Sequence, residues 1–581
     1  MTSGIWHMPR RLAYVVSHSF PYSSNGYAVR THEVAKALSG QGHEVVVFNR
    51  PGRPWDIEGF RSDVPVKTEQ VIDGVRYVFL PTGATPEMSV RDRVRQAEAA
   101  LVEAFRVFRP AVVLGVSNWE NAEPAQHAAR RMGCPFFYEQ RGFWEMSRAA
   151  CEPDFAHSKE YQRNREYEVR IAQAAEGVFT LNGAMRDELV RRGVPAGRIH
   201  LVPNGVAMPG PVRKGVTRDS IGCRSRHLLG YIGSLSDYEG VEDLLPLLKT
   251  LRDGGTDTGL LILGSSAPKG LIGSGLATPL EDRLRGLADK LGLADHVYFV
   301  PQKPQDEVGA YYSMCDAIVM PRRRTPVTEL VAPLKPYAAA AYSVPVFMTD
   351  MPPLDEIARD IEASLFPDGD MDILADMLLQ TLSRGHPATV ATLDPNVFWP
   401  RRVRLMSGLL AAAYDKVKTG PGLGAAADAH AGAQSGAEKE TARFDTAMLP
   451  RVVLQTRSAR RRVVCIGPGG GIKADQMTWA SRVSLLSALA VGEPGLFLID
   501  WAGLQAAPEP EWEGLWSIDN MRLNRQVMDA CRIALDRGWD LRVAGPVNRS
   551  RAPLFRTVAG VVEEWLPERS DDVAAEQEAA Q

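Results

Sequence analysis

The residues best suited to chemistry in this sequence are cations that follow a short apolar segment. Pro321-Arg-Arg-Arg324 comes directly after Ala317–Met320, a predicted strand, and Glu329 and Lys335 lie shortly beyond it. Guanidinium forks match phosphate oxygens, and a lysine adds a compact charge. Because open α/β sheets bind ligands at the carboxyl ends of their strands, this run predicts a phosphate site that includes Arg322. The alternative is a solvated basic loop, the usual interpretation of a charge run.

Two glycine turns occupy equivalent places, each between a predicted strand and a predicted helix. Asn25-Gly26 precedes one helix, and Gly233-Ser234 precedes another. A glycine lets a ligand approach the backbone, and amide groups in such a turn can hold a diphosphate. Neither turn carries the G-x-G-x-x-G dinucleotide fingerprint. Plain turns or packing glycines are the alternative interpretation of both.

A third cluster joins charges and aromatic rings at another predicted strand end. Tyr138-Glu139-Gln-Arg141-Gly142-Phe-Trp144-Glu145 offers carboxylates, an arginine and large rings within one short stretch. Hydrogen bonds from Glu139 and Arg141, together with ring stacking, would bind a sugar, so both residues are predicted to contact substrate. A surface ion pair is the common alternative.

Two further features carry less weight. Gly467-Pro-Gly469-Gly470-Gly471 is similar to a phosphate loop but lacks the Gly-Lys-Ser/Thr ending, which favours a flexible turn. The basic run at 457–462 favours a solvated strand flank over contact with anionic lipid. Histidines do not cluster at metal-ligand spacing, so no metal and no cofactor are expected.

These candidates need a scaffold, and the chain offers two series of alternating strands and helices. The first has predicted strands at 12–16, 44–48, 111–114, 136–138 and 177–180, and the second at 228–232, 259–263, 296–300, 317–320 and 344–348. Helical patterns lie between them, for example at 29–38, 241–251, 280–291 and 307–314. The alternation predicts an α/β fold class with two Rossmann-like domains that face each other across a cleft.

Composition shifts place the domain boundaries. We expect Rossmann-like domains at 10–208 and 209–396, a helical segment at 397–418, a linker at 419–449, an accessory α/β domain at 450–568 and a disordered tail at 569–581. The linker is rich in Gly and Ala and cannot bury enough apolar surface to fold alone. The accessory domain has predicted strands at 463–466, 496–499 and 540–544 and predicted helices at 479–490 and 523–537.

The overall composition excludes several classes of protein. Of 581 residues, 67 are Lys or Arg and 70 are Asp or Glu, so the net charge of −3 gives no field for nucleic acid. The six cysteines form no C-x-x-C pair, which favours a reducing, cytoplasmic compartment over a disulfide framework. No apolar segment approaches the length of a signal-peptide core or a spanning helix, which leaves peripheral membrane contact open.

Four segments together form a more specific pattern than any one of them alone. They are Asn25-Gly26 with Gly42-His43-Glu-Val45, then Leu201-Val-Pro-Asn-Gly-Val206, Gly230-Tyr-Ile-Gly-Ser234, and Val327-Thr-Glu-Leu-Val-Ala-Pro-Leu-Lys-Pro-Tyr-Ala338 running on to Pro345-Val346. On these segments, residues from about 12 to 416 resemble a retaining family 4 glycosyltransferase with the GT-B fold. The resemblance implies transfer of a sugar from a nucleotide donor to an acceptor, with retention and without a bound metal.

The resemblance also implies roles by position on the donor side, 209–396. By this resemblance, Gly233 and Ser234 would contact the donor diphosphate. Lys335, with Arg322, would stabilise the leaving nucleotide diphosphate, which is the main electrostatic task of transfer without a metal. Glu329 completes the predicted catalytic set.

The remaining roles fall on the acceptor side, 10–208. Asn25 and Gly26 lie where the first-domain loop approaches the donor phosphate and the acceptor. Glu139 and Arg141 occupy the stretch where many relatives place an acceptor-side histidine. The segment 397–418 would be the helix that crosses back to pack on this domain.

The sequence departs from the family pattern in the donor site. Ala338 stands where relatives carry the glutamate that binds the donor ribose, and Glu329 is one residue too far from it for Glu-x7-Glu. Glu239 stands where many relatives carry a lysine for the donor phosphate. Losing the ribose contact costs about 1–3 kcal/mol of binding if nothing replaces it. The pattern therefore permits an active transferase with an altered donor site, or a catalytically silent GT-B module that binds a glycan or a partner. A nicotinamide oxidoreductase is disfavoured because no half carries the full fingerprint.

The expected partners follow from these interpretations. They are a nucleotide-sugar donor and a glycan or lipid-linked acceptor of surface polysaccharide synthesis, with no nucleic acid. The accessory domain at 450–568 is a candidate for binding a protein partner. The expected location is cytoplasmic, with peripheral contact at the inner face of the cell membrane.

Overall fold

The computed structural model describes residues 7–61, 66–208, 215–271, 279–384, 393–417, 462–468, 477–490, 493–507, 509–515, 520–544 and 563–565. Its residues form two compact units, one that holds two α/β lobes and a smaller one with its own sheet from residue 462 onward. The predicted linker at 419–449 and tail at 569–581 lie outside the described residues. Within the described part of the chain, no helix has the length and apolar character needed to cross a membrane.

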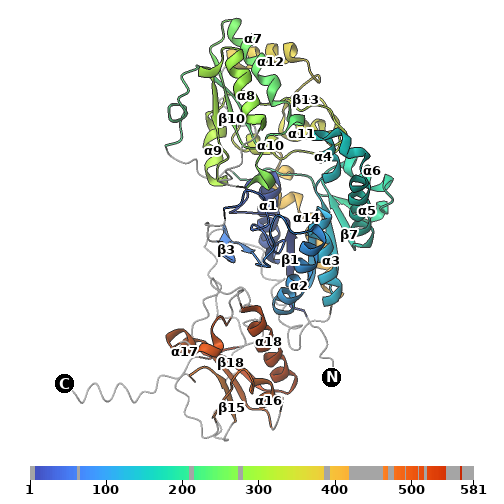
Figure 1. Ribbon diagram of the computed structural model, residues 1–581, viewed down its shortest axis with the longest axis vertical. Helices are drawn as coiled ribbons and strands as arrows, with labels where there is room; N and C mark the ends of the chain where they lie inside the picture. Colours follow the sequence, from blue (N-terminus) through green and yellow to red (C-terminus); the bar gives the residue numbers. More distant parts are fainter. Residues whose placement is uncertain are drawn as a thin grey trace, which may run out of the picture. The chain divides into compact units, whose positions relative to one another are not determined.

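The first lobe is built on an eight-stranded sheet in the order β3-β4-β2-β1-β5-β6-β7-β8. Its elements are coloured blue to teal in Figure 1. Its strands are β1 (Arg11–Val16), β2 (Glu44–Asn49), β3 (Glu69–Ile72), β4 (Val75–Val78), β5 (Val112–Val116), β6 (Phe136–Gln140), β7 (Gly177–Thr180) and β8 (Ile199–Leu201). Its helices are α1 (Gly26–Gly40), α2 (Val90–Phe108), α3 (Trp119–Met132), α4 (Trp144–Cys151), α5 (Lys159–Ala174) and α6 (Gly183–Arg191). The central strand β1 is buried at every position, which explains its continuous apolar run.

The second lobe has a six-stranded sheet in the order β11-β10-β9-β12-β13-β14, with every neighbouring pair parallel. Its strands are β9 (His227–Ile232), β10 (Thr258–Leu263), β11 (Val297–Val300), β12 (Ala317–Met320), β13 (Val346–Thr349) and β14 (Ser364–Phe366). Its helices are α7 (Leu244–Asp253), α8 (Pro279–Lys290), α9 (Gln305–Met314), α10 (Lys335–Ala341), α11 (Pro352–Ile361) and α12 (Met371–Arg384). The predicted α/β class with two Rossmann-like lobes is confirmed.

The sheet of the first lobe contains one hairpin that the helix–strand alternation does not predict. β3 and β4 pair antiparallel, whereas the other neighbours in this sheet are parallel. The two strands are joined by Asp73-Gly74, both with positive φ, at 47° and 79°. An Asp-Gly pair between two short strands is a strong local signal for a two-residue hairpin turn, so the sequence did carry this information.

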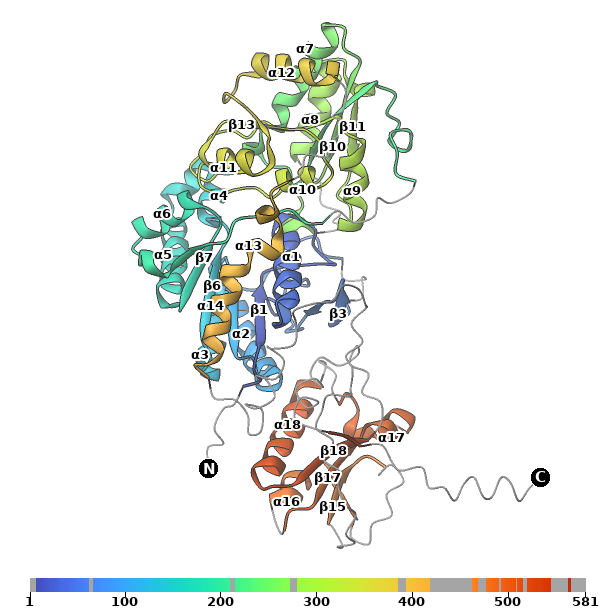
Figure 2. The same ribbon diagram turned by 180° about the vertical axis from the view of Figure 1, so that it is seen from behind.

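Helices α13 (Trp399–Arg402) and α14 (Arg404–Tyr414) follow the second lobe in sequence but pack on the first. Both views place α14 beside the sheet of the first lobe (Figures 1 and 2). Trp399, Met406 and Leu410 belong to the same core as Leu12 and Tyr14 of β1. These helices therefore tie the end of the two-lobed unit back to its beginning.

A buried histidine fastens α14 to the first lobe. His43 Nδ1 lies 2.6 Å from the Tyr414 hydroxyl, and its Nε2 lies 2.8 Å from Ser407 Oγ. Burial, reinforced by the nearby Arg10 cation, lowers the pKa of His43 to about 4. In the unfolded chain the His43 imidazole is protonated below about pH 6.5, whereas in the folded chain it stays neutral down to about pH 4. Acidification through this range therefore lowers the free energy of unfolding.

We expect His43→Asn to lose stability at pH 7 and to close most of that gap by pH 4.5. Because the variant lacks the titrating imidazole, the difference in unfolding free energy between it and the unsubstituted enzyme should shrink by up to about 3 kcal/mol over this pH range. Urea unfolding is monitored by hydrogen exchange of the β1 amides, which reports on the larger unit alone. The matched control is His157→Asn, because His157 is exposed. A gap of equal size at both pH values would assign the loss to packing instead of proton uptake.

The smaller unit is a five-stranded parallel sheet in the order β16-β15-β17-β18-β19. Its strands are β15 (Val463–Ile466), β16 (Met477–Trp479), β17 (Leu496–Asp500), β18 (Asp540–Ala544) and β19 (Glu563–Trp565), and its helices are α16 (Leu485–Ala490), α17 (Trp501–Ala506) and α18 (Met521–Asp536). The expected α/β class of this region is confirmed. Most of the basic run at 457–462 and the glycine run after Pro468 lie outside the described residues.

The helix predicted over 479–490 is wrong in its first half. Met477–Trp479 is a strand that pairs with β15, and the helix begins only at Leu485. The turn between them is closed by Ser481, whose backbone N–H donates to Ser484 Oγ at 3.0 Å. Serine side chains that bond to nearby backbone compete with helix formation, so the break falls at this pair.

Candidate active site

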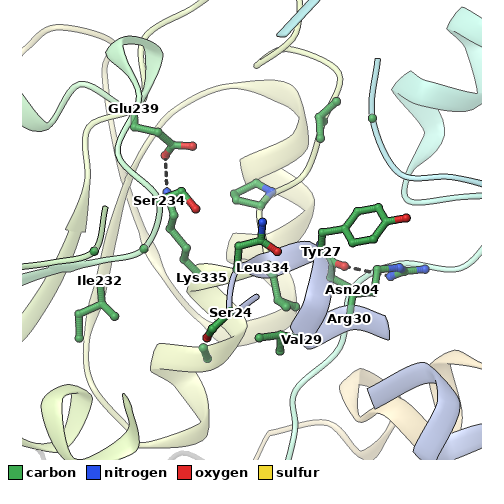
Figure 3. A pocket seen from close by; sticks show the side chains of 18 of the residues that line it. Ser24, Tyr27, Val29, Arg30, Asn204, Ile232, Ser234, Glu239, Leu334 and Lys335 are labelled. Carbon is green, nitrogen blue, oxygen red and sulfur yellow. Dashed lines mark hydrogen bonds and ion pairs between the residues drawn. The ribbon is translucent and has the colours of Figure 1, made fainter. Parts of the chain in front are cut away.

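A cavity of about 360 Å³ lies in the cleft between the two lobes of the larger unit (Figure 3). Its wall comes from the loops that follow β1 and β6 in the first lobe and β9, β10 and β12 in the second. Seven predicted site residues are among those that line it: Asn25, Gly26, Arg141, Gly233, Ser234, Arg322 and Lys335. The carboxyl ends of both sheets therefore meet at one cavity, as open α/β sheets favour.

Asn25 and Gly26 form the first-lobe edge of this cavity. Asn25 caps α1, because its Oδ1 accepts the Ala28 N–H at 3.0 Å. Its Nδ2 lies 3.0 Å from His18 Nε2, and burial lowers the pKa of His18 well below its usual value, so the neutral ring can accept this bond. A Cβ on Gly26 would lie 3.7 Å from Leu334 Cβ across the cleft.

Gly233 forms the floor on the second lobe. Its φ is 152°, and a Cβ there would lie only 2.2 Å from Lys335 Cε. A side chain at this position would displace the lysine stem, so the close packing of Lys335 requires glycine. The turn after β9 therefore packs directly against the first residue of α10. The positions of Gly233 and Lys335 in the sequence do not reveal this contact.

The cations of the second lobe meet around one carboxylate. Lys335 Nζ lies 2.8 Å from Glu239 Oε2 and donates to the Tyr231 hydroxyl at 2.6 Å. Arg322 NH2 lies 3.4 Å from Glu239 Oε1. Burial by itself would raise the pKa of Glu239, but Lys335 and Arg322 outweigh it and the pKa is lowered, so the carboxylate is ionised. Burial lowers the pKa of Lys335, and Glu239 opposes that shift.

Only one arginine of the basic run enters the cavity. Arg322 is 6% exposed, donates from NH1 to the Val331 carbonyl at 2.7 Å, and keeps a buried Nε with no hydrogen-bond partner among the described residues. Arg323 pairs with Asp243 at 2.8 Å, and Arg324 turns away. The three arginines therefore do not act as one positive site, because neighbouring residues in an extended loop face different directions.

Glu329 does not line the cavity. Its Oε1 pairs with Arg324 NH1 at 3.1 Å, and its side chain is 44% exposed. The prediction that groups Glu329 with Lys335 and Arg322 is therefore corrected: the structure brings the two cations together and leaves this glutamate in a surface ion pair.

Glu139 also lies outside the lining, but for the opposite reason. It is fully buried behind the cavity wall, where Oε1 pairs with Arg30 and Oε2 pairs with Arg141 at 2.8 Å and accepts the Tyr14 hydroxyl at 2.6 Å. Burial opposes ionisation, yet Arg141 and Arg30 lower the pKa of Glu139 to about 2. The prediction that Glu139 contacts substrate is therefore corrected: Glu139 does not line the cavity and instead orients Arg30 and Arg141, which do.

Arg30 and Asn204 also line the cavity, although neither had a predicted role. Arg30 donates from NH1 to Asn204 Oδ1 at 2.9 Å (Figure 3). Asn204 Nδ2 donates to the Ala332 carbonyl of the second lobe at 3.2 Å. Asn204 lies in the Pro-Asn-Gly stretch quoted above, and Arg30 lies one helical turn beyond Gly26. A polar side chain that follows a glycine turn by four residues faces the same side, and this spacing could have identified Arg30.

The lobes also contact each other through main-chain and side-chain groups at the rim of the cleft. Ser24 N–H donates to the Gly270 carbonyl at 2.9 Å, and Asn182 Nδ2 donates to the Leu330 carbonyl at 2.8 Å. Lys269 Nζ lies 4.1 Å from the centre of the Trp144 ring. These contacts join loops at the rim of both lobes and define the width of the cleft between them.

Ala338 lines the cavity where the resembled family has a glutamate. It packs in an apolar cluster with Ile232, Leu263 and Tyr312. Ala338 therefore offers no carboxylate to a ribose at this position. Among the described residues, no three His, Cys, Asp or Glu side chains lie close enough together to hold a metal ion.

Comparison with known proteins agrees with this geometry. A family model described as a glycosyl transferase 4-like domain matches residues 25–205, and one described as glycosyl transferases group 1 matches residues 223–390. A D-inositol 3-phosphate glycosyltransferase from Actinosynnema mirum is 32% identical over 330 residues, which is 54% of this chain and 75% of that protein. A protein of the same name from Acidothermus cellulolyticus is 26% identical over 387 residues, 62% of this chain and 80% of that protein.

The fold agrees as well. The crystal structure of Anabaena HepE in complex with UDP and glucose superposes with a TM-score of 0.50 at 15% identity, covering 70% of this chain and 100% of HepE. At this identity the likeness concerns the fold alone. The matches to both family models and to the Actinosynnema protein go further: the chain belongs to the family 4 glycosyltransferases with the GT-B fold and is a glycosyltransferase enzyme.

Proposed function

We propose that the enzyme moves a sugar, with retention, from a nucleotide-sugar donor to a glycan or lipid-linked acceptor in surface polysaccharide synthesis. The observation that carries the proposal is the cavity in which Lys335 and Arg322 of the second lobe face Asn25 and Gly26 of the first. A cleft with cations on one wall and a glycine turn on the other suits a phosphate leaving group opposite an acceptor.

The reaction follows from these groups without a bound metal or cofactor. The donor phosphate lies against Lys335 and Arg322, whose charges stabilise the negative charge that develops as the glycosidic oxygen departs. The acceptor hydroxyl attacks from the same face of the sugar. Its proton passes to the departing phosphate, so the new bond forms with retained configuration. Ser234 and Gly233 line the donor wall, and Arg141 lines the acceptor wall.

The names of relatives support a phosphate-bearing donor and a polar acceptor. HepE was crystallised with UDP and glucose, and both curated relatives act on an inositol phosphate by their names. With a lipid-linked acceptor, the enzyme would work in the cytoplasm at the inner face of the cell membrane. The accessory unit from residue 462 onward is proposed to bind a protein partner.

A catalytically silent GT-B module is the second candidate. Two observations favour it: Ala338 leaves the donor ribose without its carboxylate, and Glu239 neutralises one of the two donor-side cations. Such a module would keep the cleft and bind a glycan or a partner without transfer.

Calorimetric titration with uridine, guanosine and adenosine diphosphate sugars separates the two candidates. We expect heat of binding with one of the three, and release of the nucleoside diphosphate when crude acceptor is added. Binding fits the cations of the cavity, and release requires the transfer step. No heat with any donor together with no nucleotide release would leave the silent module as the function.

A further inference from the structure

The position of Glu239 among the cations of the donor wall points to a role of its own. Its carboxylate contacts Lys335 Nζ at 2.8 Å and Arg322 NH2 at 3.4 Å, so both oxygens are engaged. Its side chain is only 8% exposed, and Figure 3 shows its ion pair with Lys335. In a cavity that binds a phosphate, this carboxylate occupies the contacts that phosphate oxygens would make.

The backbone that carries Glu239 is held against the loop that carries Arg322. A Cβ on Gly240, whose φ is 69°, would lie 1.9 Å from the Pro321 carbonyl oxygen, so the two main chains are in direct contact. Arg323 N–H donates to the Tyr238 carbonyl at 2.9 Å. The turn at Asp237–Glu239 therefore cannot withdraw from the cations as a unit, and Glu239 can leave them only by rotating its side chain.

The charges of this cluster do not suit a diphosphate while Glu239 remains in place. Lys335 and Arg322 contribute two positive charges, and Glu239 removes one of them. The third group in contact, Tyr231, stays neutral because burial raises its pKa well above the usual value. A donor phosphate entering here meets a carboxylate of its own sign, which repels it strongly in a partly buried site.

We propose that Glu239 is an internal counter-ion that the donor phosphate must displace from Lys335 and Arg322, and that it thereby sets the affinity of the site for diphosphates. This inference rests on the proposed function, since it takes the cavity to bind the donor phosphate. When the cleft is empty, Glu239 stabilises two cations that would otherwise be buried without a counter-ion. When the leaving nucleoside diphosphate departs, the same carboxylate returns to them and favours product release.

The test is Glu239→Gln, which keeps the size of the side chain and removes its charge. We expect UDP, GDP, ADP or inorganic pyrophosphate to bind roughly 10- to 100-fold more tightly to this variant, since one like charge has gone from a poorly solvated site. Pyrophosphate isolates the phosphate contact from that of the base. The matched control is Glu242→Gln, because Glu242 lies on the next turn, pairs with Arg283 at 3.1 Å and does not line the cavity. Its affinity should equal that of the unsubstituted enzyme.

Thermal unfolding supplies a second readout that a merely structural role would not produce. The ligand-free Glu239→Gln protein should melt lower, because Lys335 and Arg322 lose their partner, whereas the rise in melting temperature on adding ligand should be larger than in the unsubstituted enzyme. If the glutamine variant does not fold, Glu239→Asp shortens the reach of the carboxylate by one methylene, and we expect a smaller tightening of the same sign.

The outcomes separate the inference from the function beneath it. Diphosphate binding to Glu239→Gln that is equal to or weaker than that of the unsubstituted enzyme would overturn the counter-ion role and leave the proposed donor site standing. Failure of every diphosphate, diphosphate sugar and pyrophosphate to bind to either protein would overturn both.

Discussion

Replacing Lys335 with alanine should lower turnover by about a hundred- to a thousand-fold, the loss typical of removing one group that stabilises charge in the transition state. Lys335 is the donor-side cation with a compact ammonium group, and it lines the cavity from the first residue of α10. Its removal leaves Arg322 to carry the leaving phosphate alone. Turnover is measured as release of the nucleoside diphosphate from the donor that the titration identifies.

The fold should survive this substitution. Glu239 keeps Arg322 as a partner, so no charge is left entirely alone. Lys249→Ala is the matched control, because Lys249 lies on α7 of the same lobe, is partly exposed and pairs only with Asp253 among the described residues. Circular dichroism and the melting temperature check the fold of both variants. Unchanged turnover in Lys335→Ala would remove this lysine from the mechanism.

Replacing Glu139 with glutamine should produce the largest loss of stability. Glu139 is buried between Arg30 and Arg141 and accepts the Tyr14 hydroxyl, so the substitution leaves two buried guanidinium groups without their counter-ion. Breaking a buried ion pair from one side costs about 3–5 kcal/mol. Urea unfolding followed by hydrogen exchange of the β1 and β6 amides measures this loss for the larger unit alone.

The loss should depend on pH in a defined direction. The pKa of Glu139 is about 2 in the folded protein and near 4.5 in the unfolded chain, so its stabilising effect is complete above pH 4.5 and disappears as the pH falls through 2. The gap between Glu139→Gln and the unsubstituted enzyme should therefore shrink between pH 7 and pH 3. Glu160→Gln, which removes an exposed ion pair with Arg148, is the control and should change stability by less than about 1 kcal/mol. A gap that stays constant down to pH 3 would show that shape and not charge is responsible.

Part of the candidate site was predictable because it is encoded locally. Gly233 and Lys335 can each be recognised in the sequence, because each follows a predicted strand in a strand–turn–helix pattern. Their mutual contact was not predictable. It depends on how the turn after β9 packs against α10, and these are separated by about a hundred residues of intervening structure.

Glu139 and Glu329 show that local sequence does not predict whether a carboxylate is buried or exposed. Both are carboxylates near predicted strand ends, so their residue types and positions look alike in sequence. The structure buries Glu139 completely because α1 brings Arg30 over the end of β6, whereas Glu329 remains on an exposed loop beside Arg324. Burial of a charge is decided by which distant cation packs against it, and no local pattern reports that.

The order of elements along the chain was sufficient for the α/β class and for the two lobes, because hydrophobic periodicity and glycine turns act over a few residues. What needed the folded chain was the chemistry of the cleft: that one arginine of three enters it, that Asn204 joins the lobes, and that Glu239 holds both donor-side cations. Each of these rests on distances between loops that follow different strands, either within the second lobe or across the cleft, and such distances are set by tertiary packing and not by local sequence preferences.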